Sequence, residues 1–216
     1  MRENRIEKKF VFGKYQEDNL EKTLLSNGFS RLYPSRSISS LYIDTINYDF
    51  AKDNINGVSK RKKIRFRWYN EDISNISLEE KNKQNFQVNK IINKVNNLNL
   101  KGTLLQNLKE YFFSLKKEYN NYNYKFVLKT NYSRSYWISD NNLIRATIDT
   151  NIKASPISNL NHNLELNETI LEFKFSPLDE NIFRNLFFLN NFNLRTKKYS
   201  KYLQSFNLLE NSGLIN

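Results

Sequence analysis

One segment, Arg61–Tyr69, alternates basic and large apolar residues with a period of two. This period is typical of a β-strand, in which successive side chains point to opposite faces of a sheet. The apolar face carries Ile64, Phe66 and Trp68, and the opposite face carries Arg61, Lys63, Arg65 and Arg67. Same-face neighbours lie about 7 Å apart, within a Debye length of ~8–10 Å. The four charges therefore repel one another unless an anion lies over them.

The same alternation predicts further strands along the chain. We expect strands at Arg5–Phe12, Ser40–Asp44, Arg61–Tyr69, Leu78–Lys83, Lys125–Trp137, Leu143–Asp149 and Ile170–Phe175. Their polar faces carry Arg5, Glu7 and Lys9; Glu79, Lys81 and Lys83; Tyr132 and Arg134; Arg145 and Asp149; and Glu172 and Lys174. A solvated outer face explains any one of these strands. The recurrence of Arg, whose planar fork suits phosphate, favours an inward-facing charged surface.

Helical spacing appears between the strands. We expect helices at Glu17–Asn27, closed by Gly28, and at Leu104–Tyr119, capped by Thr103. A third is expected after Asp179, with Phe183 and Phe187 on its apolar face, and a fourth at Tyr199–Leu209. Asn93–Asn99 and Ala154–Glu168 are expected to be loops. The pattern predicts a single α+β domain over residues 1–216, with a mostly antiparallel sheet.

Composition limits the chemistry that this chain can perform. With Cys 0 and His 1, it has no disulfide framework, thiolate metal site, cysteine nucleophile or multi-histidine metal site. Lys+Arg 34 against Asp+Glu 22 gives a net charge of +12, which indicates an anionic partner, although a biased genome explains the charge equally well. No apolar leader and no stretch of ~18 apolar residues is present, so we expect a cytoplasmic protein.

Closing the sheet with its charged faces inward would create a wet, cationic barrel, with the apolar outside packed under the helices. Such a lumen suits triphosphate or polyphosphate chemistry, in which basic groups neutralise phosphoryl oxygens and a carboxylate holds a divalent metal. Glu172 is the first metal candidate, followed by Glu7 and Glu79; pairing with neighbouring Lys and Arg is an equal reading of each. A terminal phosphate is already ionised and needs no basic residue to activate it.

Eight short motifs, in this order, resemble the catalytic domain of the vacuolar transporter chaperone (VTC) complex and its stand-alone prokaryotic relatives. These are polyphosphate polymerases with the triphosphate tunnel metalloenzyme fold. The resemblance runs from Arg5 nearly to Tyr202. The motifs are R-I-E-K-K-F (Arg5–Phe10), L-Y-I-D-T (Leu41–Thr45), R-K-K-I-R-F-R-W-Y (Arg61–Tyr69), L-E-E-K-N-K (Leu78–Lys83), N-Y-S-R (Asn131–Arg134), R-A-T-I-D-T (Arg145–Thr150), L-E-F-K (Leu171–Lys174) and K-Y-S-K-Y (Lys198–Tyr202).

The resemblance implies a closed, eight-stranded antiparallel tunnel with surrounding helices, and it assigns roles to residues inside it. Charge stabilisation during transfer is assigned to Lys9, Arg65, Arg67, Arg134 and Arg145. Phosphate contacts are assigned to Lys81, Tyr132, Lys198, Ser200 and Lys201, and the alternation adds Arg5, Lys63, Lys83 and Lys174. Glu172 would hold Mn²⁺ or Mg²⁺, with Glu7 as a second candidate ligand.

The function that follows from the resemblance is transfer of the γ-phosphate of ATP onto a growing polyphosphate chain. Related tripolyphosphatases open with an E-x-E-x-K strand, whereas this chain has Arg5 and Glu7 in place of the two Glu. That difference favours the polymerase, with hydrolysis of triphosphate or polyphosphate as the alternative. A non-catalytic nucleic-acid-binding module is a further alternative, disfavoured because the aromatic residues fall mainly opposite the basic stripe. Peripheral attachment at the inner face of a membrane, beside a partner that exports the chain, is left open.

Overall fold

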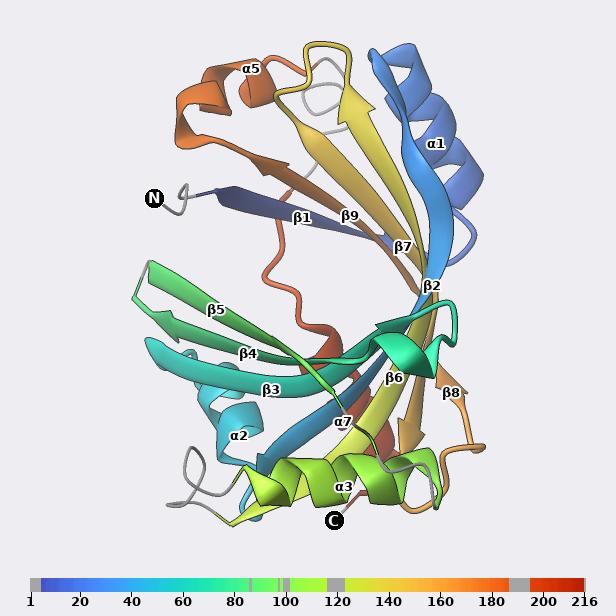
Figure 1. Ribbon diagram of the computed structural model, residues 1–216. Helices are drawn as coiled ribbons and strands as arrows, with labels where there is room; N and C mark the ends of the chain where they lie inside the picture. Colours follow the sequence, from blue (N-terminus) through green and yellow to red (C-terminus); the bar gives the residue numbers. More distant parts are fainter. Residues whose placement is uncertain are drawn as a thin grey trace.

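The computed structural model describes residues 5–85, 87–96, 98, 102–115, 123–186 and 195–215. Its main feature is one strongly curled antiparallel sheet (Figure 1). The strands follow in the order β1-β9-β7-β6-β2-β3-β4-β5, and the short β8 pairs with β7. Their bounds are β1 Ile6–Gly13, β2 Phe29–Thr45, β3 Lys60–Tyr69, β4 Ser77–Gln84, β5 Gln87–Lys94, β6 Tyr124–Ser139, β7 Arg145–Pro156, β8 Leu164–Glu165 and β9 Glu168–Phe175.

The predicted fold class is confirmed, with one refinement at the seam of the barrel. Strands β1 and β5 end the sheet, and no backbone pairing joins them among the described residues. Side chains cross this seam instead: Lys81 Nζ of β4 lies 3.5 Å from Glu7 Oε2 of β1. The segment before the last helix also lies along β1, because Lys197 N donates to Lys9 O. The sheet is thus a half-barrel, and a side-chain contact and a connecting segment lie at its open seam.

Helices α1 and α3 cover the outer, apolar face of the sheet. Helix α1 (Glu17–Ser26) packs Leu20 and Leu24 against Trp137 and Phe173. Helix α3 (Leu104–Ser114) packs Phe112 with other residues against the outer face of β3 and β6. The remaining helices are α2 (Asp49–Ile55), α5 (Glu180–Arg184) and α7 (Lys201–Asn211). Because the apolar sides of the strands are used here, their charged sides are left for the interior.

Helix α7 packs against the inner face of the sheet and closes the tunnel at depth. Its Tyr202 stacks on Tyr42 of β2, with ring centroids 4.9 Å apart. The Tyr202 hydroxyl donates to the buried carboxylate of Asp44, which also accepts from the backbone N–H groups of Phe50 and Ala51 at the start of α2. Asp44 therefore joins β2, α2 and α7.

The predicted helix ends are partly correct. Gly28 follows α1 with φ +72°, and Thr103 forms a capping box with Gln106, as expected. Asp179 makes no capping hydrogen bond; Ser176 caps the short 3₁₀ turn before α5 instead. Helix α7 begins at Lys201 rather than Tyr199. The predicted extension of α3 to Tyr119 and the position of Phe187 lie outside the described residues.

Three predicted strand or loop boundaries were wrong. Strand β2 begins at Phe29, far before Ser40, and β7 runs on to Pro156 through part of the predicted loop. Strand β5 and helix α2 were not expected at all, and β5 takes in the first two residues of the predicted loop at Asn93–Asn99.

Candidate active site: a cationic tunnel

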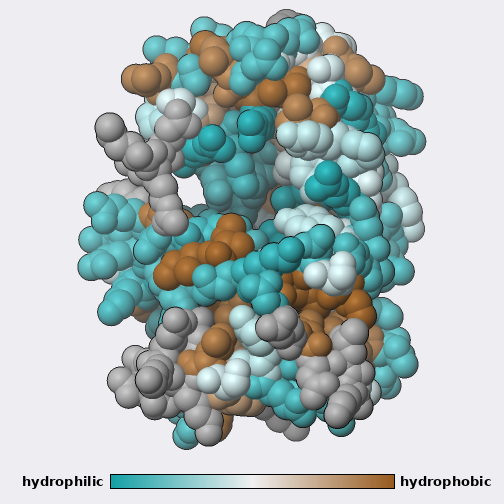
Figure 2. All heavy atoms as spheres, in the orientation of Figure 1, coloured by the Kyte–Doolittle hydropathy of each residue, from teal (hydrophilic) through white to brown (hydrophobic). Residues whose placement is uncertain are grey.

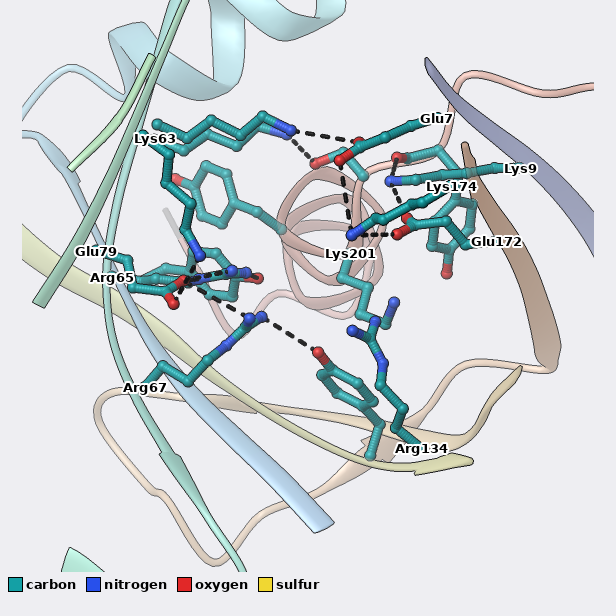
Figure 3. Close-up of a pocket in the computed structure, with 17 residues that line it drawn as sticks. Glu7, Lys9, Lys63, Arg65, Arg67, Glu79, Arg134, Glu172, Lys174 and Lys201 are labelled. Atoms are coloured by element: carbon teal, nitrogen blue, oxygen red, sulfur yellow. Dashed lines mark hydrogen bonds and ion pairs between the residues drawn. The ribbon is translucent and has the colours of Figure 1, made fainter. Parts of the chain in front are cut away.

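The inner face of the curled sheet encloses a cavity of about 190 Å³. Figure 2 shows this hollow bordered by hydrophilic side chains, and Figure 3 shows basic side chains reaching into it from opposite walls. The lining residues are Glu7, Lys9, Tyr42, Lys63, Arg65, Arg67, Glu79, Lys81, Lys90, Tyr132, Arg134, Glu172, Lys174, Tyr199, Ser200, Lys201 and Tyr202. Nine of these are basic and three are acidic, so the cavity carries an excess of six positive charges.

Glu79 of β4 is the hub of one wall. Its Oε2 accepts from Arg65 Nε and Nη2 at 2.8 and 2.6 Å, and its Oε1 accepts from Lys90 Nζ at 2.9 Å. Arg67 Nη1 lies 3.6 Å from the same carboxylate. Burial alone would raise the pKa of Glu79, but the charges of Arg65 and Arg67 outweigh it and lower the pKa to about 2. Glu79 is therefore ionised and paired with three basic side chains.

Glu172 of β9 and Glu7 of β1 form the opposite wall. Glu172 accepts from Lys174 at 2.8 Å and lies 3.1 Å from Lys9 Nζ. Lys174 also lies 3.6 Å from Glu7, so the two carboxylates share one lysine. Burial opposes ionisation of both groups, but the neighbouring lysines lower both pKa values, that of Glu172 far below its usual range.

This pair of carboxylates fits a divalent cation of the Mg²⁺ type. Such ions are often bound by one or two carboxylates, while substrate phosphates and waters complete the coordination. No group of three or more His, Cys, Asp or Glu gathers within the described ranges, so the protein alone does not offer a complete metal cage. The donor set instead favours a cation that arrives with a phosphorylated substrate.

A fourth carboxylate, Asp149 of β7, holds two basic residues at the base of the tunnel. It accepts two hydrogen bonds from Arg134, one of them at 2.7 Å from Nη2, and a further one from Lys201 at the start of α7. Burial would raise the pKa of Asp149, but these partners lower it to about 2. The buried Tyr132 ring lies beside both cations, and its hydroxyl accepts from Arg67 Nη2 at 3.2 Å.

Lys63 differs from the other basic residues, because it has no carboxylate partner among the described residues. Its Nζ donates to Ser200 Oγ at 2.6 Å, and Ser200 also caps α7 by accepting from Leu203 N. Burial, with the charges of Lys9, Lys81 and Arg65, lowers the pKa of Lys63 to about 7. The free tunnel thus holds a lysine that is only half protonated near neutral pH.

Twelve of the sixteen predicted site residues line the cavity. The other four, Arg5, Lys83, Arg145 and Lys198, lie outside its lining. Arg145 is exposed. It lies on the same face of β7 as Asp149, four residues before it along the strand. Lys83 has its pKa lowered by burial and by the charges of Arg61 and Lys198, so these three lie near one another. The four extend the positive surface beyond the cavity.

Sequence reasoning missed four lining residues, Tyr42, Lys90, Tyr199 and Tyr202. Glu79 was expected either to hold a metal or to pair with neighbouring Lys and Arg, and the structure shows the pairing. Lys90 lies on β5, which was not predicted. Tyr42 lies in a predicted strand, so its alternation with Ile43 was available as a signal.

The curled antiparallel sheet and its cationic interior define a protein of the triphosphate tunnel class. The family model for the VTC domain matches residues 4–210, and the chain belongs to this family. No functionally curated protein matches the chain by sequence. Within the described part of the chain, no helix is long and apolar enough to span a membrane.

Solved structures support the fold at low sequence identity. A candidate adenylate cyclase of Bacillus halodurans is 14% identical, with a TM-score of 0.58 and coverage of 94% of this chain and 97% of that chain. A candidate adenylyl cyclase of Hippeastrum, described as having a dominant triphosphatase activity, is 12% identical, with a TM-score of 0.58 and coverage of 98% and 97%. A candidate adenylate cyclase of Vibrio parahaemolyticus is 12% identical, with a TM-score of 0.54 and coverage of 95% and 99%.

Proposed function

We propose that this protein is a polyphosphate polymerase that transfers the γ-phosphoryl group of ATP to the end of a polyphosphate chain. The observation that carries the proposal is the convergence of nine basic side chains from several strands and α7 on one enclosed cavity. An elongated polyanion is the ligand that such a lined tunnel can neutralise along its length. The VTC family match supports polyphosphate as that ligand.

The transfer requires little covalent chemistry from the protein. A terminal oxygen of the acceptor chain attacks the γ-phosphorus of ATP, and the bond from that phosphorus to the β–γ bridging oxygen breaks. ADP leaves with the bridging oxygen and its electron pair. The attacking oxygen is already ionised, so no residue needs to remove a proton. Arg65, Arg67 and Arg134 would spread the charge on the transferred group.

Glu172, with Glu7, would hold Mn²⁺ or Mg²⁺, which when bound neutralises charge on the triphosphate and helps to orient it. Lys9 and Lys174, which pair with these carboxylates in the structure, would contact phosphate oxygens of the bound substrate.

The test is incubation of the purified protein with ATP and Mn²⁺ or Mg²⁺, followed by gel electrophoresis of the product. A ladder of long chains supports the polymerase. Free phosphate alone would instead support hydrolysis, the second candidate, which the triphosphatase activity of the Hippeastrum neighbour favours.

Two variants test the assigned roles. Arg65→Ala and Glu172→Ala are each expected to lower the rate of chain synthesis about 10²–10³-fold, the usual effect of removing one charge-stabilising group. Lys22→Ala, on the exposed face of α1, removes one positive charge outside the tunnel and serves as the control. Synthesis at the wild-type rate by either folded tunnel variant would show that the roles are assigned wrongly.

The nucleic-acid alternative has little structural support. Phe66 and Trp68 are buried in the outer core under α3, where they cannot stack on bases. The basic groups that they alternate with point into the enclosed cavity, where a folded duplex has no access.

A further inference from the structure

A group of aromatic and basic side chains lies beyond the tunnel cavity, where β2 and β6 extend past the end of β3. It consists of Tyr33 and Arg36 of β2 and Tyr136 of β6, and we call it the mouth cluster. The two rings meet edge to face, with centroids 5.9 Å apart. The Arg36 guanidinium carbon lies 5.8 Å from the centroid of each ring. None of these residues belongs to the lining of the cavity.

A β-bulge brings the cluster together. Arg36 pairs with Arg134 and Tyr33 pairs with Tyr136, so three steps along β2 match two steps along β6. In a regular strand Tyr33 and Arg36 would point to opposite faces, because side chains alternate. The extra residue in Pro34–Ser35 reverses this alternation and places both on the face of Arg134 and Tyr136. Bulges often redirect side chains next to active sites.

The cluster continues the inner surface of the tunnel. Tyr132, Arg134 and Tyr136 occupy alternate positions on β6, so Tyr136 lies about 7 Å beyond Arg134 along the strand. The pKa of Tyr136 is raised, with burial as the largest cause, while the charges of Arg134 and Arg36 oppose the rise. Across the sheet, Tyr136 pairs with Thr147, and Thr147 pairs with Glu172. The Tyr136 ring therefore lies two strands from the candidate metal carboxylate, and the Tyr33 ring three strands from it.

The exposure and charge of the cluster resemble those of a binding surface. Tyr33 is 48% exposed, although tyrosine rings of a packed core are buried. Arg36 is exposed and has no carboxylate partner in the part of the chain that the structure describes, unlike Arg65, Arg67 and Arg134. A shallow hollow formed by residues 31–35 adjoins Tyr33. The surface thus offers the exposed ring of Tyr33 beside a cation that has no carboxylate partner among the described residues.

We propose that the mouth cluster is a nucleoside subsite, in which the base of a nucleoside triphosphate stacks on Tyr33, with Tyr136 and Arg36 beside it. A base presents a flat π-face that stacks on aromatic and guanidinium planes. Its triphosphate, one ribose away, would pass Arg134 and enter the tunnel. The inference rests on the proposed function in taking a nucleotide as phosphate donor. It adds a reason why the protein would prefer a nucleotide to bare tripolyphosphate, which has no base.

The test compares the Kd of ATP with that of inorganic tripolyphosphate by titration calorimetry, in wild type and in Tyr33→Ala. ATP is expected to bind roughly 5- to 150-fold more weakly to the variant, the loss of one base–aromatic stack. Tripolyphosphate is expected to change less than about 2-fold, because the phosphate contacts remain. Tyr33→Trp should keep ATP binding, and Tyr15→Ala, which removes an 82% exposed tyrosine elsewhere, should change neither ligand.

The outcomes separate this inference from the proposed function. Equal effects of Tyr33→Ala on both ligands, no effect on ATP, or no ATP binding by the wild type would each overturn the subsite. A wild type that makes no polyphosphate, yet binds ATP in a manner that depends on Tyr33, would refute the polymerase and leave the subsite standing.

Discussion

Glu79→Gln should show how far the carboxylates of the tunnel hold its basic side chains in place. Glu79 pairs with Arg65, Arg67 and Lys90, and its side chain is almost wholly buried. Its pKa falls from 4.5 to about 2 on folding, a shift of about 2.5 units. At about 1.36 kcal/mol per unit, the charged pairing contributes roughly 3 kcal/mol to the free energy of unfolding at pH 7. The variant loses this contribution and leaves three cations facing one another.

The assay is urea unfolding at pH 7, with Glu80→Gln as the matched control. Glu80 is the next residue on β4, and its carboxylate lies 3.3 Å from Lys62 on the other face of the sheet. Glu79→Gln is expected to cost much more stability than Glu80→Gln. Saturating tripolyphosphate should reduce the difference in stability between the two variants, because phosphate oxygens replace the missing carboxylate.

The pH dependence gives a second check on Glu79. Because its folded pKa is lower than its unfolded pKa, its contribution is complete above about pH 4.5 and disappears as the pH falls toward 2. The stability difference between wild type and Glu79→Gln should shrink over that window. The counter-ion role would be refuted if Glu79→Gln and Glu80→Gln lowered the free energy of unfolding equally at pH 7. It would also be refuted if tripolyphosphate left the difference in stability between the two variants unchanged.

Three further effects are expected. Tripolyphosphate binding at pH 7 should take up about half a proton, because Lys63, with a pKa of about 7, is half protonated in the free protein and becomes fully charged beside the anion; calorimetry in buffers of different ionisation enthalpy measures the uptake, and Lys63→Arg should abolish it. Asp44→Asn should lower the free energy of unfolding by about 1–3 kcal/mol, since its amide would face backbone N–H donors; an unchanged urea midpoint would contradict this. Thr103→Ala should cost about 1 kcal/mol by loss of the α3 cap, and Thr103→Ser little.

The strands that form the tunnel could be predicted because one face of each is buried in an apolar core and the other is charged. In β3, Ile64 and Phe66 are fully buried outside while Arg65 and Arg67 face the cavity, so the period of two is visible in the sequence. The same contrast marks Glu172 and Phe173 on β9. A sheet that closes on such strands must bring their charges together, which is why most expected site residues share one cavity.

Strand β5 could not be predicted for a physical reason. It is an edge strand, and nearly all of its side chains are exposed, so neither face selects apolar residues. Val88 and Ile92 flank Lys90 on the inner side, while Ile91 lies on the outer side with two asparagines. With apolar and polar residues on both faces, the alternation is lost. Lys90 was therefore missed as a partner of Glu79.

The mouth cluster escaped sequence reasoning because one inserted residue changes the face on which Tyr33 lies, and a second irregularity between Arg31 and Tyr33 restores the alternation before it. If side chains alternate regularly back from Tyr42, then Ser40, Ile38 and Arg36 lie on the inner face, which is correct. The same alternation places Tyr33 on the outer face, which is wrong. Only the pairing of Tyr33 with Tyr136 shows that the count fails at Pro34–Ser35. A strand 17 residues long, extended through an irregular segment, also exceeds what a short alternating pattern can indicate.

The carboxylates explain how the tunnel holds so many like charges before its substrate arrives. Glu79, Asp149 and Glu172 each bind at least two basic groups from different elements. Without them, the basic side chains would turn toward solvent, and ordering them again would weaken each binding event. In the proposed transfer, these pairs would hold the Arg forks where charge develops, which is the condition for electrostatic catalysis. The carboxylates compete with phosphate for the same Lys and Arg side chains. A long polyanion would offset this competition by contacting several of these ion pairs at once.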